Sequence, residues 1–229
     1  MSETASNVEF AHRIFEHGHH PSSPTDRRAE FVEIVEAAVL AIVAIATAWS
    51  GYQVAKWDAL SIQEYSLASR VTVLAQAKTT LAGQDRLYDI TTFNGWVAAK
   101  VSGHDKLAAF YERRFRSEYG AAFTAWRKLD PMNNSSAPPG PIFMPEYTNA
   151  NSQEAANFVQ EAQHHFERGV GMRDTGDRYV KVTVFLATVL LLTALSQRFK
   201  VFGPRVAVVA VALLLLIVST YWIITFPRA

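Results

Sequence analysis

An uncharged apolar run near the end of the sequence, residues 206–226, most restricts what this chain can become. About twenty such residues in a helix match the thickness of the hydrocarbon core of a bilayer. A soluble helix that is apolar on every side needs a large core to bury it. The run therefore predicts a transmembrane helix, and the rest of the chain is interpreted as part of an integral membrane protein.

Two further stretches, residues 30–56 and 179–197, extend this interpretation. The middle of the first, from Ala37 to Ala55, is uncharged and about long enough to cross a bilayer. Its many small residues suit a helix that packs against protein rather than lipid. The sequence thus predicts three transmembrane helices, with the lipid bilayer as the surrounding partner.

The turn between the two C-terminal stretches, residues 198–205, carries Arg198, Lys200 and Arg205 and no acidic residue. Short basic loops stay on the cytoplasmic side of a membrane. This predicts a cytoplasmic N-terminus, with residues 57–178 in the periplasm or outside the cell. The opposite orientation is the alternative.

A sizeable part of the chain is polar, because the mean hydropathy is only +0.04. Lysine and arginine number 22 against 21 aspartate and glutamate, and this balance argues against a nucleic-acid partner. The absence of cysteine excludes disulfides, thiol nucleophiles and thiolate metal sites. We therefore expect an extramembrane domain over residues 57–178 that binds no nucleic acid.

Apolar and small residues recur every seven positions in this domain, as in packed helices. One series is Leu60, Leu67, Leu74 and Leu81; a second is Ala155, Ala162, Gly169 and Gly176; a third is Phe158, His165, Met172 and Tyr179. An antiparallel bundle within the chain explains these series as well as a parallel oligomer does. The predicted fold class is all-α: three transmembrane helices and an extramembrane helical bundle, built on long helices continuous with spans 1 and 2.

The first long helix is expected to run to about Gly83, since no glycine or proline interrupts it after Trp57. A single further helix is expected from about Asp105 to Leu129. The prolines of residues 130–147 predict a loop.

Residues 1–29 form a polar tail with four histidines, His12, His17, His19 and His20. Clustered histidines can bind a divalent metal, but nothing else in the tail completes a coordination shell. We therefore predict a solvated tail and no metal site.

Five polar residues of the first span are candidates for lining a pore or for packing helices: Glu33, Glu36, Thr47, Ser50 and Gln53. Glutamates near a bilayer can line an ion path but are more often interfacial and solvated, which is the expectation for Glu33 and Glu36. The series Ala155, Ala162, Gly169 and Gly176 is the candidate helix-packing seam.

No sequence motif of a nucleophile elbow, a phosphate loop, a dinucleotide site or a zinc protease is present. We expect no catalytic residue and no cofactor, and therefore no enzyme. The favoured function is an oligomeric scaffold, or an accessory subunit of a membrane complex, that associates with itself or with other membrane subunits. The alternative is an ion channel or transporter whose pore is lined by the first span.

Three stretches resemble a group of bacterial inner-membrane proteins of unknown function: Ala48–Trp57, Arg173–Tyr179 and Leu195–Phe199. Proteins of that group have one N-terminal span, a helical segment and a C-terminal hairpin of two spans. The resemblance implies a fold and a location in a bacterial inner membrane, and it implies no activity.

Overall fold

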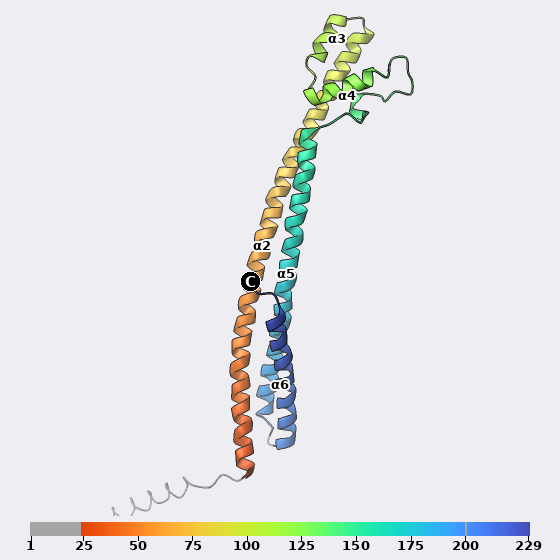
Figure 1. The fold of residues 1–229 in the computed structure, drawn as a ribbon. Coiled ribbons are helices and arrows are strands. Elements are labelled where there is room, and N and C mark those ends of the chain that lie inside the picture. The colour runs from red at the N-terminus through yellow and green to blue at the C-terminus, as the bar shows by residue number, and fades with distance from the viewer. Residues whose placement is uncertain (1–23, 200) are drawn as a thin grey trace, which may run out of the picture. The chain divides into compact units, whose positions relative to one another are not determined.

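A computed structural model describes residues 24–199 and 201–229, which are helical with connecting loops and contain no strand (Figure 1). The elements in order are α2 (Pro24–Val101), α3 (Asp105–Glu112), α4 (Ser117–Arg127), the short 3-10 helix η1 (Pro141–Phe143), α5 (Ala150–Ser196) and α6 (Phe202–Thr225). The predicted all-α class is confirmed. The four histidines of the tail and Lys200 lie outside the described residues.

Three helices, α2, α5 and α6, each contain a stretch long and apolar enough to cross a membrane, which confirms the number of predicted spans. At 78 and 47 residues, α2 and α5 greatly exceed the length that a bilayer needs. Both continue unbroken from apolar into polar sequence, as predicted. The first of them extends beyond the expected end near Gly83, as far as Val101, because one glycine does not stop a well-packed helix.

The chain divides into two compact units, although α2 and α5 contribute to both. The first unit contains the described residues up to Ala59 together with Met172–Ala229. The second unit is Leu60–Gly171.

The first unit is a three-helix bundle with an apolar core (Figure 1). Each helix contributes buried aliphatic side chains: Val39 and Val43 from α2; Val182, Leu186 and Val189 from α5; and Ala212 and Leu216 from α6. The outer faces of these helices are also apolar, so the bundle is suited to contact with the lipid of a bilayer.

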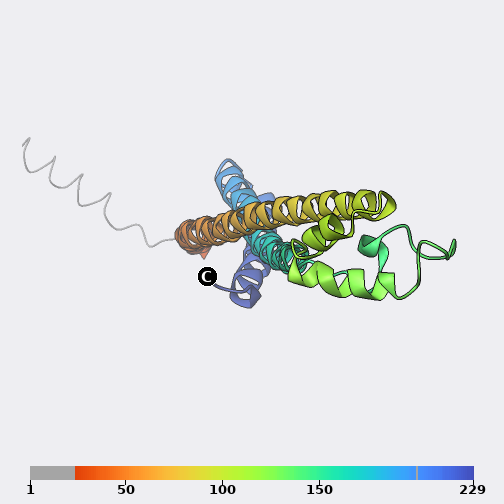
Figure 2. The ribbon, with the colours of Figure 1, turned by 90° about the horizontal axis from the view of Figure 1, so that it is seen from above.

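The second unit contains an aromatic cluster where α3 and α4 lie beside the last turns of α2 (Figure 2). Its largest buried side chains are Trp96, Tyr119, Phe123 and Trp126. The rings of Trp96 and Phe123 meet edge to face, with centroids 5.0 Å apart. Such pairs stabilise a core by about 0.5–1.5 kcal/mol beyond the area they bury.

The single helix expected from Asp105 to Leu129 is two helices. The backbone becomes extended at Arg116, with φ −62° and ψ 150°, and α4 begins at the next residue. This break turns the Arg116 guanidinium toward Asp89 of α2, where it forms an ion pair. A tertiary charge contact therefore accompanies the interruption of a segment whose local sequence favours helix.

Buried and half-buried side chains follow two seven-residue series along α2. One series keeps its register over the helix: Glu36, Val43, Ser50, Trp57, Glu64, Val71, Lys78, Asp85, Thr92 and Ala99. Its companion lies three residues later in the first unit (Val39, Ala46, Gln53) and four residues later in the second (Ser61, Ala68, Ala75, Ala82, Asp89, Trp96). Two successive spacings of four mark a stutter, which locally unwinds helix packing, and it coincides with the boundary between the units.

A change of register of the opposite kind occurs on α5, where two successive spacings of three (Gly176, Tyr179 and Val182) mark a stammer. The series Phe158, His165, Met172, Tyr179, Leu186 and Thr193 continues through both units. Its companion changes from Ala155, Ala162, Gly169 and Gly176, three residues earlier, to Val182, Val189 and Ser196, three residues later. Alanine and glycine thus occupy this series in the polar half of α5 and as far as Gly176, and valines take their place further along the helix.

The predicted leucine series lies at the edge of the helix contact rather than within it. Leu74 and Leu81 are 50% and 44% exposed, whereas Val71 and Ala75 beside them are buried. The seven-residue spacing was correct for helix packing, but it does not distinguish the centre of a contact from its flank.

Candidate functional site

A buried ion pair joins the three helices of the first unit. Glu36 on α2 is 2% exposed and accepts hydrogen bonds from Arg205 Nε at 3.0 Å and Nη2 at 2.8 Å. Ser196 on α5 donates a third, at 2.8 Å. Because Arg205 belongs to α6, each helix supplies one member of the set. Paired charges of this kind are stable in a bilayer only when both partners remain.

This geometry corrects the expectation of two solvated glutamates. Glu33 is indeed exposed, with its carboxylate 3.9 Å from Arg205. Glu36 is buried and paired, and both of its carboxylate oxygens are occupied. The two residues, three apart on the helix, therefore have different environments.

The polar residues further along the first span face the interior of the same bundle. Ser50 and Gln53 are completely buried. Four polar atoms on this face have no hydrogen-bond partner among the described residues: Thr47 Oγ1, Ser50 Oγ, Gln53 Nε2 and Trp57 Nε1. A buried polar group without a partner costs about 1–3 kcal/mol. All the buried side-chain polar atoms without a partner in the described part of the first unit therefore lie on this face.

The residues that follow α6 lie against this polar face. The backbone N–H of Ala229 donates to Gln53 Oε1 at 3.0 Å. The Tyr179 hydroxyl donates to the carbonyl oxygen of Pro227 at 3.1 Å, and its ring meets that of Phe226 edge to face. The segment after α6 is thus held by side chains of α2 and α5.

The small residues of α5 are buried on the side that faces α2. Ala155 and Ala162 are 6% and 8% exposed. A Cβ added at Gly169 would lie 2.6 Å from the ring of Tyr65, closer than carbon atoms approach. In the first unit, a Cβ at Gly176 would meet Trp57 at an ordinary 3.5 Å. Close approach of the two helices thus requires glycine at position 169 more than at 176.

Ion pairs follow one edge of the α2–α5 contact in the second unit. Lys78 lies 2.6 Å from Glu154. Glu64 lies 2.7 Å from His165 Nδ1 and 3.0 Å from Arg168. The hydrogen bond from His165, together with the charge of Arg168, holds the pKa of Glu64 below its usual range against the opposing effect of burial.

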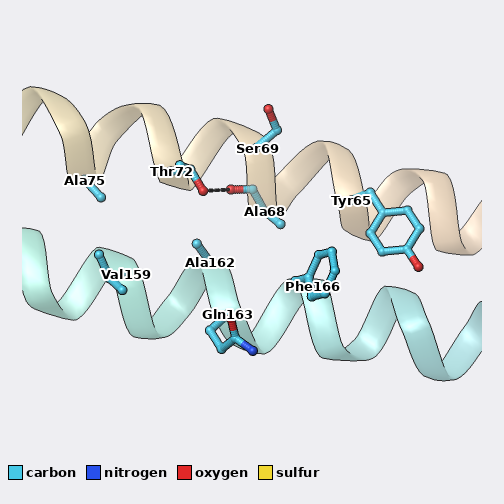
Figure 3. Close-up of a pocket in the computed structure, with 9 residues that line it drawn as sticks. All are labelled: Tyr65, Ala68, Ser69, Thr72, Ala75, Val159, Ala162, Gln163 and Phe166. Atoms are coloured by element: carbon cyan, nitrogen blue, oxygen red, sulfur yellow. Dashed lines mark hydrogen bonds between the residues drawn. The ribbon is translucent and has the colours of Figure 1, made fainter.

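The other edge of the same helix pair is an uncharged groove of about 680 Å³ (Figure 3). Its lining is Tyr65, Ala68, Ser69, Thr72 and Ala75 from α2 and Val159, Ala162, Gln163 and Phe166 from α5. None of these nine side chains carries a charge. The alanine methyls point into the gap between the helices, whereas Ser69 and Gln163 point away from it (Figure 3).

A third polar site anchors the aromatic cluster. Asp89 is fully buried and accepts hydrogen bonds from Arg116 at 3.0 and 2.8 Å and from the Tyr147 hydroxyl at 3.1 Å. This contact raises the pKa of Arg116, so the guanidinium remains charged. Burial raises the pKa of the phenols of Tyr119 and Tyr147, with the charge of Asp89 as a second cause. These phenols therefore act as neutral groups at any physiological pH.

Among the described residues, no three histidine, aspartate or glutamate side chains are arranged so that they could hold a metal ion. His164 and His165 are neighbours, but only His165 contacts a carboxylate, that of Glu64.

Sequence reasoning missed two of these sites. It treated Arg205 only as a charge of the cytoplasmic turn, and nothing local indicates that this arginine pairs with Glu36, 169 residues earlier. A signal for Asp89 was present, because Asp89 continues the spacing of Ala68, Ala75 and Ala82. A charged residue in a buried series indicates a buried partner.

No protein-family model, curated protein or solved structure matches this chain. The resemblance to bacterial inner-membrane proteins therefore stays a prediction.

Proposed function

We propose that this protein is a non-enzymatic membrane scaffold, or an accessory subunit of a membrane complex, that works by association of its helices. The single observation that carries this proposal is the uncharged groove on the α2–α5 pair of the second unit. Grooves of this kind, open to solvent and apolar, mark interaction surfaces in proteins.

The architecture around the groove supports the same function. Stable domains bury their helices in at least two packed layers. The two hydrophobic clusters of the described residues lie in the three-helix bundle and around α3 and α4. Neither includes the stretch of α2 and α5 that lines the groove. A partner that covers this stretch completes its burial.

The proposed location is a bacterial inner membrane, with the N-terminus cytoplasmic and residues 57–178 periplasmic or extracellular. The support for the location is the resemblance to bacterial inner-membrane proteins, and the support for the orientation is the positive charge of the turn between α5 and α6. Since Arg205 is neutralised by Glu36, this charge comes from Arg198 and Lys200. A single cysteine in the cysteine-free chain tests the orientation. Ser135→Cys in the proline-rich loop should react with a membrane-impermeant maleimide added to intact spheroplasts, and protection until lysis would reverse the orientation.

The scaffold function is tested by the mass of the native particle. The full chain is extracted in a mild detergent, and its mass is measured by native mass spectrometry and by light scattering after size exclusion. The expected particle contains more than one protein chain, either copies of this one or other membrane subunits. A lone monomer over a range of mild detergents and lipid nanodiscs would refute the proposal.

A channel or transporter is the second candidate, and the unpaired polar atoms of Thr47, Ser50 and Gln53 favour it. Buried polar groups in a membrane helix are costly and are usually retained for function. Ion flux into liposomes containing the protein, lost in Gln53→Leu and kept in Thr188→Val on the exposed face of α5, would support it. Flux at the level of empty liposomes would remove this candidate.

A further inference from the structure

The α2–α5 pair of the second unit has two unlike edges. The ion pairs Lys78–Glu154 and Glu64–Arg168 border one edge. The groove on the other edge is lined only by uncharged side chains. Both edges belong to the same two helices, so the difference is one of side-chain chemistry and not of local fold.

Apolar side chains extend the groove on both helices. Val159 and Phe166, on its α5 wall, are 57% and 50% exposed. Ile62, three residues before Tyr65 on α2, is 64% exposed, and Val170, four residues after Phe166, is 37% exposed. Residues three or four apart lie on the same side of a helix, so these side chains widen one continuous apolar surface.

The groove lacks what a small-molecule site needs. Such sites combine apolar walls with a few polar groups that converge on the ligand. Here the Thr72 hydroxyl already donates to the carbonyl oxygen of Ala68 at 2.8 Å. Ser69 and Gln163 point away from the gap (Figure 3). Among the lining residues in Figure 3, the Tyr65 hydroxyl is the one side-chain polar group that lies toward the gap without a bond to its own helix. One such group does not make a converging set, so the surface offers mainly packing, which suits helices as the occupant.

We propose that the occupant is a second copy of this chain, packed groove against groove so that two α2–α5 pairs form a four-helix bundle. This inference rests on the proposed scaffold function and names its partner. Two helical hairpins that bury their apolar faces against each other are a known way of building such a bundle.

The charge distribution selects a second copy over a partner of opposite charge. In a two-fold interface the same surface meets itself, so a surface with a net charge repels its own copy, whereas an uncharged surface does not. This surface has no charge among its nine lining residues, whereas the opposite edge has several. Insertion of both copies in one membrane also raises their effective concentration, as linkage does for tethered modules.

Cross-linking tests which edge faces the partner. Because the native chain has no cysteine, each single-cysteine variant carries one reactive thiol. Single cysteines are placed at the rim of the groove, as Ser69→Cys and Gln163→Cys, and on the opposite edge, as Leu74→Cys and Glu161→Cys. A short bis-maleimide is added to native membranes. The groove variants are expected to give a band at twice the monomer mass, several-fold stronger than that of the matched controls. Equal or stronger cross-linking from the opposite edge would overturn the inference.

A charge placed in the groove provides the second test. Val159→Glu alters a side chain that is already exposed, so the single chain should still fold, which circular dichroism checks. In detergent, its dimer dissociation constant should rise about a hundredfold or more, because like charges in an interface cost several kcal/mol. Leu74→Glu, at a similarly exposed position on the other edge (50% against 57% for Val159), should leave the dissociation constant within about threefold of that of the unmodified chain.

The outcomes separate this inference from the scaffold function. An oligomer whose mass is unchanged by Val159→Glu refutes the groove-to-groove contact and leaves the scaffold function standing. A particle in which other subunits cover the groove, shown by their cross-links to Ser69→Cys, refutes the second copy alone. A lone monomer refutes both.

Discussion

Replacing Asp89 by asparagine should loosen the aromatic cluster of the second unit. The Asp89 carboxylate is fully buried and is held by two hydrogen bonds from Arg116 and one from Tyr147. Asparagine keeps the shape and removes the charge, so Arg116, itself only 19% exposed, loses its one fully buried counter-ion. Removing one partner of a buried ion pair costs about 3–5 kcal/mol.

The expected loss lies at the lower end of that range. Arg116 retains Glu118 at 2.8 Å and Asp85 at 3.4 Å, and both of these carboxylates are partly exposed. A loss of about 3 kcal/mol corresponds to a change of somewhat more than a hundredfold in the opening equilibrium. Amide hydrogen exchange reports this equilibrium locally, so peptides from Ser117–Arg127 should exchange about a hundredfold faster.

A matched control is Asp105→Asn. Asp105 forms an ion pair of similar length with Lys100, at 2.8 Å, but its side chain is 80% exposed. Exposed pairs contribute at most about 1 kcal/mol, and a carboxylate at a helix N-terminus contributes about as much. Peptides from α6 serve as an internal reference in both variants. Equal exchange in the two variants would show that burial of the Asp89–Arg116 pair has no bearing on its contribution to stability.

Three further predictions concern the helix contacts. Glu36→Gln removes the buried counter-ion of Arg205 and leaves only the exposed carboxylate of Glu33, 3.9 Å away. The helical signal in detergent should therefore be lost at a lower temperature, with a loss of roughly 3–5 kcal/mol, whereas Glu33→Gln should cost less than about 1 kcal/mol. Equal effects would show that the Glu36 ion pair is not stabilising. The Cβ of Gly169→Ala crowds Tyr65, whereas that of Gly83→Ala meets no atom within 4 Å. Urea unfolding should therefore find Gly169→Ala less stable than Gly83→Ala by about 1–3 kcal/mol. A Gly169→Ala variant that is the more stable of the two would contradict the close approach of the helices. The pKa of Glu64 lies below its ordinary value of 4.5, so its stabilising effect is complete above that value and is lost as the pH falls through the lower folded-state value. The difference in unfolding free energy between the native chain and Glu64→Gln should therefore shrink as the pH is lowered below 4.5, and a difference that is constant with pH would contradict this assignment.

The sequence by itself determined the helical class and the three spans. An uncharged run of about twenty residues leaves few alternatives to a membrane helix, since no water-exposed element tolerates it. The continuity of α2 and α5 followed in the same way, because nothing in either helix except isolated glycines opposes helix formation. The small-residue series of α5 was visible because its spacing is a property of one helix alone.

The tertiary structure decided which side of each repeat is the contact. A seven-residue spacing fits any line along a helix, and only the neighbouring helix determines that Val71 and Ala75 are buried while Leu74 remains exposed. The same holds for charges: Glu36 and Arg205 are 169 residues apart, and only folding brings them within 2.8 Å. Local sequence determines periodicity and hydropathy, whereas pairing across the chain depends on which faces meet, and that is a property of the whole fold.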